Sequence, residues 1–190
     1  MKVAIIGAGP SGLTAIKACL EEGLYPVCLE QKNRLGGLWY YEDKGYYSVY
    51  ASVAINTSKE MSCFSDFPAP RSFPPFMHNK IYLEYLERYA SWFDLKKHIR
   101  FNTRVKKVTK ALNHEETGMW QVCSQEIASE DNVVSKVELF DAVMVCNGHH
   151  SEPSWPDIPG MNSFSGLMIH SRFYKDHKPF EGKKVLVVGK

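Results

Sequence analysis

Short apolar runs that end in glycine alternate with longer stretches of helical spacing at the start of this chain of 190 residues. Residues 3–6 are apolar and lead straight into glycines, which predicts a buried strand. Residues 10–22 carry apolar side chains near one face and stop at Gly23, which predicts a helix, and residues 26–30 predict a second strand. This order of elements predicts a βαβ unit whose two strands are parallel.

The next part of the chain has little periodicity until a strongly amphipathic stretch. Residues 31–75 are loop-like and rich in proline, and so long a loop inside a compact domain is usually functional. Residues 79–93 repeat apolar side chains at i, i+3, i+4 and i+7, which predicts a helix capped by Asn79. Its tyrosine and tryptophan stripe is interpreted as core packing rather than as a ligand platform.

Five further apolar runs follow. Residues 99–108, 120–124 and 137–139 predict the strands of a smaller sheet with polar turns between them. Residues 141–146 predict a buried strand closed by Asn147-Gly148. Residues 184–188 predict a final strand, and the glycine after it repeats the pattern of the first strand.

Composition excludes several classes of function. Apolar residues make up 44% of the chain and charged residues 23%, which is typical of a globular protein. The net charge is only +2 and no dense basic block occurs, so we expect no nucleic-acid partner. No apolar run reaches the roughly 20 residues of a membrane span, so we expect no membrane segment in this chain. Five scattered cysteines without a C-x-x-C pair favour reduced thiols in a cytosol-facing protein.

A glycine-rich turn carries the first chemical signal. Gly7-Ala8-Gly9-Pro10-Ser11-Gly12 fits G-x-G-x-x-G, directly after a predicted strand and at the start of a predicted helix. Its glycines permit a tight turn, close approach of a pyrophosphate and close packing of helix on strand. The helix N-terminus attracts phosphate, and Glu30 at the end of the next strand is spaced to accept hydrogen bonds from ribose hydroxyls. A negative charge there repels a 2′-phosphate, which favours FAD or NAD over NADP at this first site.

A second glycine pair, Gly36-Gly37, comes shortly after Glu30 and allows another close backbone approach, which we expect to be to the far half of a dinucleotide. The position of this pair favours a role in FAD binding over that of a plain surface turn. Other chemistry has little support. Leu13 stands where a nucleophile elbow needs glycine, and the histidines lack the spacing of metal ligands, so we expect no metal site.

Residues 164–174 fit F-x-G-x-x-x-H-x-x-x-Y, which resembles the signature of the flavin-containing monooxygenases. Tyr174, rather than tryptophan, favours that family over the related ketone-oxidising monooxygenases. The resemblance is collinear over essentially the whole chain. It includes the segments "GLWYY" at 37–41, "INTSKEMSCFSDFP" at 55–68, "FMHN" at 76–79 and "VMVCNGHH" at 143–150.

The resemblance implies a flavin-dependent monooxygenase that uses NADPH and O2 to oxygenate soft nitrogen or sulfur nucleophiles, amines or sulfides, through a C4a-hydroperoxyflavin. It implies that Asn56 is the catalytic residue, beside the flavin. It implies FAD contacts at Gly7, Ala8, Gly9, Pro10, Ser11, Gly12, Glu30, Gly36, Gly37, Leu38, Trp39, Ile55, Asn56 and Thr57. From the residues alone, Asn56 has a rival interpretation as a loop asparagine that caps backbone groups.

The implied fold is α/β, a Rossmann-like FAD-binding domain with a three-layer β/β/α arrangement and a small antiparallel insertion, within a two-dinucleotide-domain flavoprotein. Residues 1–150 would form the FAD-binding domain, including the loop 31–78 and the small sheet 99–140. Residues 151–182 would cross between domains, and 183–190 would be the first strand of a truncated NADPH-binding domain whose main part is missing. Full-length family members are often associated with the endoplasmic reticulum.

Two rival interpretations stay open. The chain is alternatively a non-catalytic truncated FAD-binding module, or part of a ketone-oxidising flavoprotein monooxygenase.

Overall fold

The computed structural model describes residues 1–43, 47–129, 132–149 and 151–189. Its centre is a parallel sheet in the order β3 (Ile99–Arg100), β2 (Tyr25–Leu29), β1 (Lys2–Ile6), β7 (Ala142–Val145). The first unit is β1 (Lys2–Ile6), α1 (Pro10–Glu21) and β2 (Tyr25–Leu29), with β1 and β2 parallel and in register. The βαβ unit predicted from the sequence is therefore confirmed.

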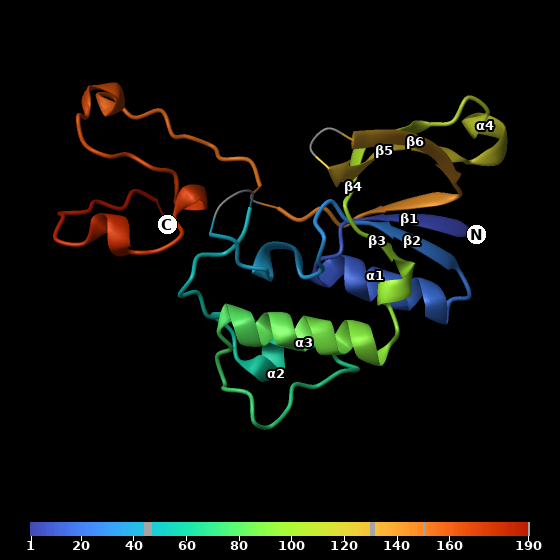
Figure 1. Cartoon of the computed structure of the whole chain (residues 1–190), viewed down its shortest axis with the longest axis horizontal. Helices are drawn as coiled ribbons and strands as arrows, with labels where there is room; N and C mark the ends of the chain where they lie inside the picture. Colours follow the sequence, from blue (N-terminus) through green and yellow to red (C-terminus); the bar gives the residue numbers. More distant parts are fainter. Residues whose placement is uncertain (44–46, 130–131, 150, 190) are drawn as a thin grey trace.

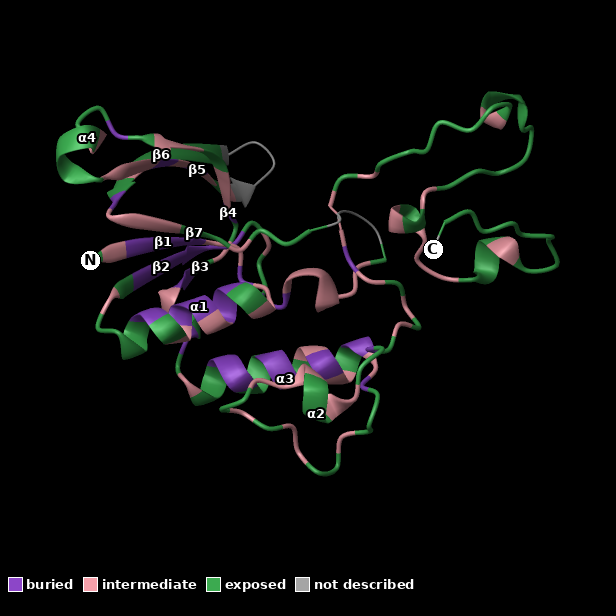
Figure 2. Cartoon of the chain, turned by 180° about the vertical axis from the view of Figure 1, so that it is seen from behind, coloured by how far each residue is buried: buried purple, intermediate pink, exposed green. Residues whose placement is uncertain are grey.

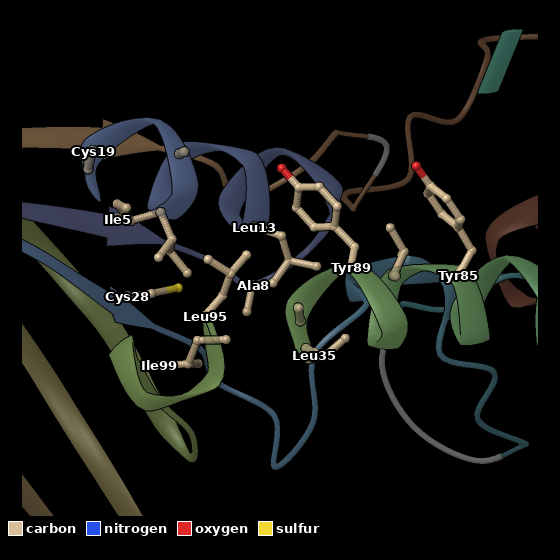
Figure 3. Packing of buried hydrophobic residues seen from close by; sticks show 14 of the residues in the cluster. Ile5, Ala8, Leu13, Cys19, Cys28, Leu35, Tyr85, Tyr89, Leu95 and Ile99 are labelled. Atoms are coloured by element: carbon tan, nitrogen blue, oxygen red, sulfur yellow. The ribbon is translucent and has the colours of Figure 1, made fainter. Parts of the chain in front are cut away.

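The two faces of the parallel sheet carry different layers, because successive side chains of a strand point to opposite sides. Val3 and Ile5 lie in the core on the helix side, with residues of α1 and α3 (Asn79–Trp92). Ala4 packs on the other side with Val122 and Phe140 of the antiparallel sheet. Figures 1 and 2 show this order of layers, and Figure 3 shows the helix-side core at close range. The three-layer β/β/α arrangement is confirmed.

Helix α3 has the predicted amphipathic face. Tyr82, Tyr85 and Tyr89 are buried against α1 and the loop that follows α2 (Lys59–Ser62), whereas Trp92 is 75% exposed. The tyrosines thus pack in the core as predicted. The expected cap is wrong by one residue: His78 is the N-cap and its Nδ1 accepts the Lys80 N–H, while buried Asn79 donates from its side chain to the carbonyl of Tyr50.

The predicted strand 99–108 is two strands that belong to different sheets. β3 (Ile99–Arg100) pairs with β2, and β4 (Thr103–Lys110) pairs with β5 (Trp120–Ser129). Asn102 separates them with a φ of +53°, a left-handed conformation that a continuous strand does not contain.

The antiparallel sheet is completed by β6 (Asn132–Phe140) in the order β4-β5-β6. Strands β5 and β6 are longer than the apolar runs that predicted them, because their outer faces carry polar or exposed side chains. Helix α4 (His114–Thr117) lies in the connection between β4 and β5. Glu138 of β6 connects the layers: its carboxylate pairs with Lys2 of β1 at 3.4 Å and with Arg100 of β3 at 2.7 Å.

The long loop is irregular, as predicted, but it is fixed by its own contacts. It contains a 3-10 turn at Gly37–Trp39 and the one-turn helix α2. The Lys59 ammonium donates to three backbone carbonyls of the proline-rich stretch, those of Pro70, Arg71 and Phe73. Satisfied carbonyls of this kind hold a loop in one conformation.

β7 (Ala142–Val145) is the edge of the parallel sheet, and the chain then leaves the sheet. The described residues after β7 contain only 3-10 turns, at Met161–Ser163, Ser171–Phe173 and Lys178–Phe180. The strand predicted at 184–188 does not form: Val185 and Leu186 are exposed, because no strand of the described residues lies beside them to exchange hydrogen bonds (Figure 1). Lys190, the last residue of the segment 183–190 assigned to an NADPH-binding domain, lies outside the described residues.

Candidate functional site

The glycine-rich turn joins the carboxyl end of β1 to α1. Gly7 has a φ of +99°, and a Cβ there would lie 2.6 Å from the carbonyl oxygen of Cys146, which follows β7. A Cβ on Gly12 would lie 1.9 Å from the Gly7 carbonyl oxygen. Both positions therefore require glycine for the backbone to close, as predicted for a tight turn and for helix-on-strand packing.

The amino end of α1 is suited to an anion. Gly9 is the N-cap, Pro10 occupies the first turn, and none of the described side chains caps the helix. The first N–H groups of such a helix lack intrahelical acceptors, and they carry the positive end of the helix dipole. Ser11 is exposed and Gly12 buried in this turn, so both predicted phosphate contacts lie at the same helix end.

Glu30 lies directly beneath the turn. Its side chain is buried, with 5% exposure, and Oε2 accepts the Ala8 N–H at 2.7 Å while Oε1 accepts the Lys32 N–H at 2.9 Å. A carboxylate has about four acceptor positions, so two remain for a further donor. The carboxylate thus fixes the glycine-rich turn and keeps acceptor capacity beside it.

The second glycine pair packs against the first motif. The Gly36 N–H donates to the Ala8 carbonyl at 2.9 Å. Gly37 has a φ of +58°, and a Cβ there would lie 3.1 Å from the Cα of Gly9. The structure therefore brings the two glycine motifs, which are nearly thirty residues apart in sequence, into backbone-to-backbone contact.

A cavity of about 530 Å³ contains the other predicted residues. Trp39, Ile55, Asn56 and Thr57 all line it, whereas Leu38 lines a neighbouring cavity. Five further residues line the first cavity, and the sequence interpretation did not select them for the site: Tyr50, Val53, Ala54, Ser62 and Tyr82.

Asn56 is exposed at the cavity, and in the part of the chain that the structure describes its side-chain amide has no hydrogen-bond partner. The interpretation of Asn56 as a backbone cap therefore gains no support. The hydroxyls of Thr57 and Ser62 are hydrogen-bonded to each other in the wall of the same cavity. The cavity thus offers a free amide and a hydroxyl pair on one side.

Tyr82 shows why residues of this site were missed. Its ring meets Trp39 edge-on at 4.7 Å between centroids, and burial raises the pKa of its phenol above the ordinary value of 10.0. The phenol is therefore protonated near neutral pH. Helical spacing identified Tyr82 only as a core residue, and it is one, but it also lines the cavity behind Trp39.

Comparisons with known proteins agree with this geometry. Residues 1–190 match the family described as FMO-like, Flavin-binding monooxygenase-like. The rat protein named Flavin-containing monooxygenase 5 is 48% identical over 99% of this chain and 35% of its own length. The chain thus spans about a third of the length of the curated relatives that it matches.

Solved structures give the same result. The structure of S-allyl-L-cysteine S-oxygenase from Allium sativum has a TM-score of 0.85 at 29% identity, covering 94% of this chain and 43% of its own. A closed cyclohexanone monooxygenase structure has a TM-score of 0.66 at 26% identity, covering 96% of this chain and 31% of its own. With its glycine turn, acidic strand end and adjoining cavity, this chain belongs to the flavin-binding monooxygenase-like family.

Proposed function

We propose that this chain provides the FAD-binding part of a monooxygenase that uses NADPH and O2 to oxygenate soft nitrogen or sulfur atoms of small molecules. The observation that carries the proposal is the contact between the two glycine motifs. That contact forms a narrow backbone surface at the N-terminus of α1, with Glu30 beneath it and the cavity of Trp39 and Asn56 beside it.

FAD fits this arrangement in charge and in space. Its phosphates would lie at the uncapped end of α1, where Gly9 and Gly37 carry no side chain to obstruct them. Its adenosine ribose would donate hydroxyl protons to the free acceptor positions of Glu30, and its ring system would lie against Trp39, Ile55, Asn56 and Thr57. Gly36 and Leu38 would line the passage between these two ends.

Bound FAD supplies two-electron redox chemistry and the activation of oxygen. The protein's own contribution is to position groups and to exclude water. Asn56 offers a neutral amide that donates and accepts hydrogen bonds without releasing a proton of its own. Trp39, held edge-on by Tyr82, closes one wall of the cavity with apolar surface.

The proposal of a soft nucleophile rather than a ketone as the substrate rests on similarity to known proteins. The S-oxygenase structure is more similar to this chain than the cyclohexanone monooxygenase structure, with TM-scores of 0.85 and 0.66. Tyr174, at the last position of the signature, favours the same choice.

The remaining assignments are part of the proposal. Residues 1–150 form the FAD-binding domain, 151–182 the crossing segment, and 183–190 the start of an NADPH-binding domain. No helix in the described ranges is long and apolar enough to span a bilayer. We propose a cytosol-facing location, with the association with the endoplasmic reticulum that full-length relatives often have.

The reaction is tested by product analysis. The FAD-loaded chain, joined to the NADPH-binding part of a flavin-containing monooxygenase, is supplied with NADPH and O2 together with a tertiary amine, a thioether or a cyclic ketone. N-oxide or sulfoxide formation supports the proposal, and a lactone alone supports a ketone-oxidising enzyme. Bound flavin without any NADPH oxidation supports the non-catalytic FAD-binding module.

A further inference from the structure

A second cavity, of about 460 Å³, lies between the long loop and the crossing segment. Its lining comes from Leu38 and residues 47–50 on one side, and from Glu152, Ser154, residues 170–172 and Tyr174 on the other. Tyr50 lines this cavity and the proposed flavin cavity, so the two adjoin. The glycine-rich turn contributes nothing to its wall among the described residues. It is therefore a separate space beside the flavin site.

The two walls are held together by specific contacts. The Ala51 N–H donates to the Lys175 carbonyl at 2.8 Å, and the ring of Tyr50 meets that of Tyr174 edge-on at 5.4 Å. The Tyr47 hydroxyl donates to the carbonyl of His149 at 2.6 Å. The cavity is thus a built feature of the fold.

Arg172 lines this cavity with an unsatisfied guanidinium. Its Nη1 is buried and has no hydrogen-bond partner among the described residues. The guanidinium lies over the Tyr47 ring, with Cζ at 5.1 Å from the ring centroid, so the side chain is fixed in place. A buried donor without an acceptor is rare in proteins and indicates a missing partner.

A second cation lies close by. The Lys175 ammonium donates to the hydroxyl of Ser48, a residue that lines the cavity, and no described carboxylate pairs with Lys175. Burial, followed by the charge of Lys32, lowers the pKa of Lys175, and Arg172 adds to the lowering while Glu42 and Asp43 oppose it. Positive charges are therefore concentrated here, and the neighbouring carboxylates do not neutralise all of them.

The other polar groups on the wall are few. Lys32 is neutralised by Glu42 at 2.6 Å. Glu152 is the carboxylate on the wall, and it is exposed. His170 uses Nδ1 to accept the Arg172 N–H, which leaves Nε2 as the site of its proton when the ring is neutral.

We propose that this second cavity binds a phosphate group, with Arg172 as the principal ligand and Lys175 and Ser48 as secondary ones. A guanidinium fork matches phosphate geometry, and phosphate supplies the acceptor that Nη1 lacks. The rings of Tyr47, Tyr50 and Tyr174 give the cavity flat apolar walls. These walls favour a phosphate ester that carries a planar ring, such as a nucleotide, over the bare ion.

The test is calorimetric titration of the FAD-saturated chain, and of the chain without FAD, at constant ionic strength. The probes are inorganic phosphate, adenosine monophosphate and NADP+. The variants are Arg172→Gln, Arg172→Lys, which keeps the charge without the fork, and Lys175→Gln. Arg88→Gln is the matched control, because Arg88 is an exposed arginine on α3, outside the lining of this cavity, that pairs with Glu84 and lies over the Phe73 ring.

We expect saturable binding that Arg172→Gln weakens about tenfold or more, Arg172→Lys less so, and Arg88→Gln not at all. Binding of inorganic phosphate with this pattern identifies the free ion as sufficient, and binding of the nucleotides alone identifies the ester. The proposal is overturned if no probe saturates, or if every probe binds Arg172→Gln as it binds the unaltered chain. Circular dichroism and thermal melting of each variant establish that the fold is retained. FAD binding is measured separately, so its failure does not count for or against this cavity.

Discussion

The Ala8 N–H donates to Glu30 Oε2 at 2.7 Å, so the carboxylate that ends β2 holds the turn that follows β1. Two parallel strands are thereby joined at their carboxyl ends by one buried charged acceptor. The proposed FAD site depends on this contact, because the carboxylate that sets the position of the turn is also the group proposed to accept the ribose hydroxyls.

Glu30→Gln removes the charge and keeps the shape of the side chain. We expect the unfolding free energy to fall by about 1–2 kcal/mol, because hydrogen bonds to a charged acceptor are stronger than those to a neutral one. FAD affinity should fall by about tenfold for the same reason. Urea denaturation and flavin titration measure both. Glu22→Gln, at an exposed position after α1, is the control, and equal effects of the two substitutions would contradict the role of Glu30.

Gly37→Ala and Gly118→Ala form a matched pair, because both glycines have a positive φ, +58° and +71°. The backbone strain should cost each variant about 1–2 kcal/mol. A Cβ at 37 would meet the Cα of Gly9 at 3.1 Å, whereas a Cβ at 118 would have no described atom within 4 Å. We therefore expect Gly37→Ala to lose about 1 kcal/mol more in stability and to bind FAD more weakly. Identical stability and identical flavin binding in the two variants would show that the motif contact is unimportant.

Tyr82→Leu tests the support behind Trp39. Loss of the edge-on ring contact and the space left behind should lower stability by about 2–3 kcal/mol. Tyr82→Phe keeps the ring, so it should stay within about 1 kcal/mol of the unaltered chain. Denaturant melts compare the three proteins. If the leucine and phenylalanine variants melt together, the ring contact contributes nothing.

Acid stability depends in part on Glu138. Burial raises the pKa of this carboxyl, but Arg100, Lys136 and Lys2 outweigh it and hold the pKa below the ordinary value of 4.5. A group with a lowered folded pKa stabilises the fold above its unfolded pKa, and this contribution is lost as the pH falls through the folded value. Stability should therefore fall below about pH 4.5, and less steeply in Glu138→Gln. Equal slopes in melts between pH 3 and pH 6 (about three units around the ordinary pKa) would rule out this contribution.

Local patterns in the sequence were sufficient to predict the βαβ unit, the buried face of α3 and the tight glycine turn. These patterns failed where the conformation or the contacts of a single residue set the boundary of a strand or helix. Asn102 has a left-handed backbone conformation, which divides one apolar run between two sheets. The periodicity of apolar residues carries no information about such a conformation. His78 caps α3 because Asn79 is drawn into the core to donate to the Tyr50 carbonyl.

Some residues of the candidate site were selected from the sequence, and others were not. Trp39, Ile55, Asn56 and Thr57, for which the resemblance implied FAD contacts, line one cavity, and their binding roles stay predictions. Ser62 and Tyr82 were missed because one is a short polar residue in a loop and the other fits helical core spacing. Contacts across the long loop bring them to the cavity, and such contacts leave no local pattern.

The central claim is FAD binding at the contact of the two glycine motifs, and titration of the chain with FAD tests it most directly. Gly9→Ala is the decisive variant: Gly9 has a φ of −77°, which alanine adopts freely, and its Cβ would lie 3.6 Å from the Gly37 Cα, an ordinary contact. The fold should persist while the added methyl group obstructs the phosphates. Gly23→Ala, beyond the other end of α1, is the control. We predict saturable quenching of flavin fluorescence by the unaltered chain and by Gly23→Ala, with affinity at least about tenfold weaker in Gly9→Ala. No saturable quenching by the unaltered chain, or equal affinity in a folded Gly9→Ala variant, would contradict the account.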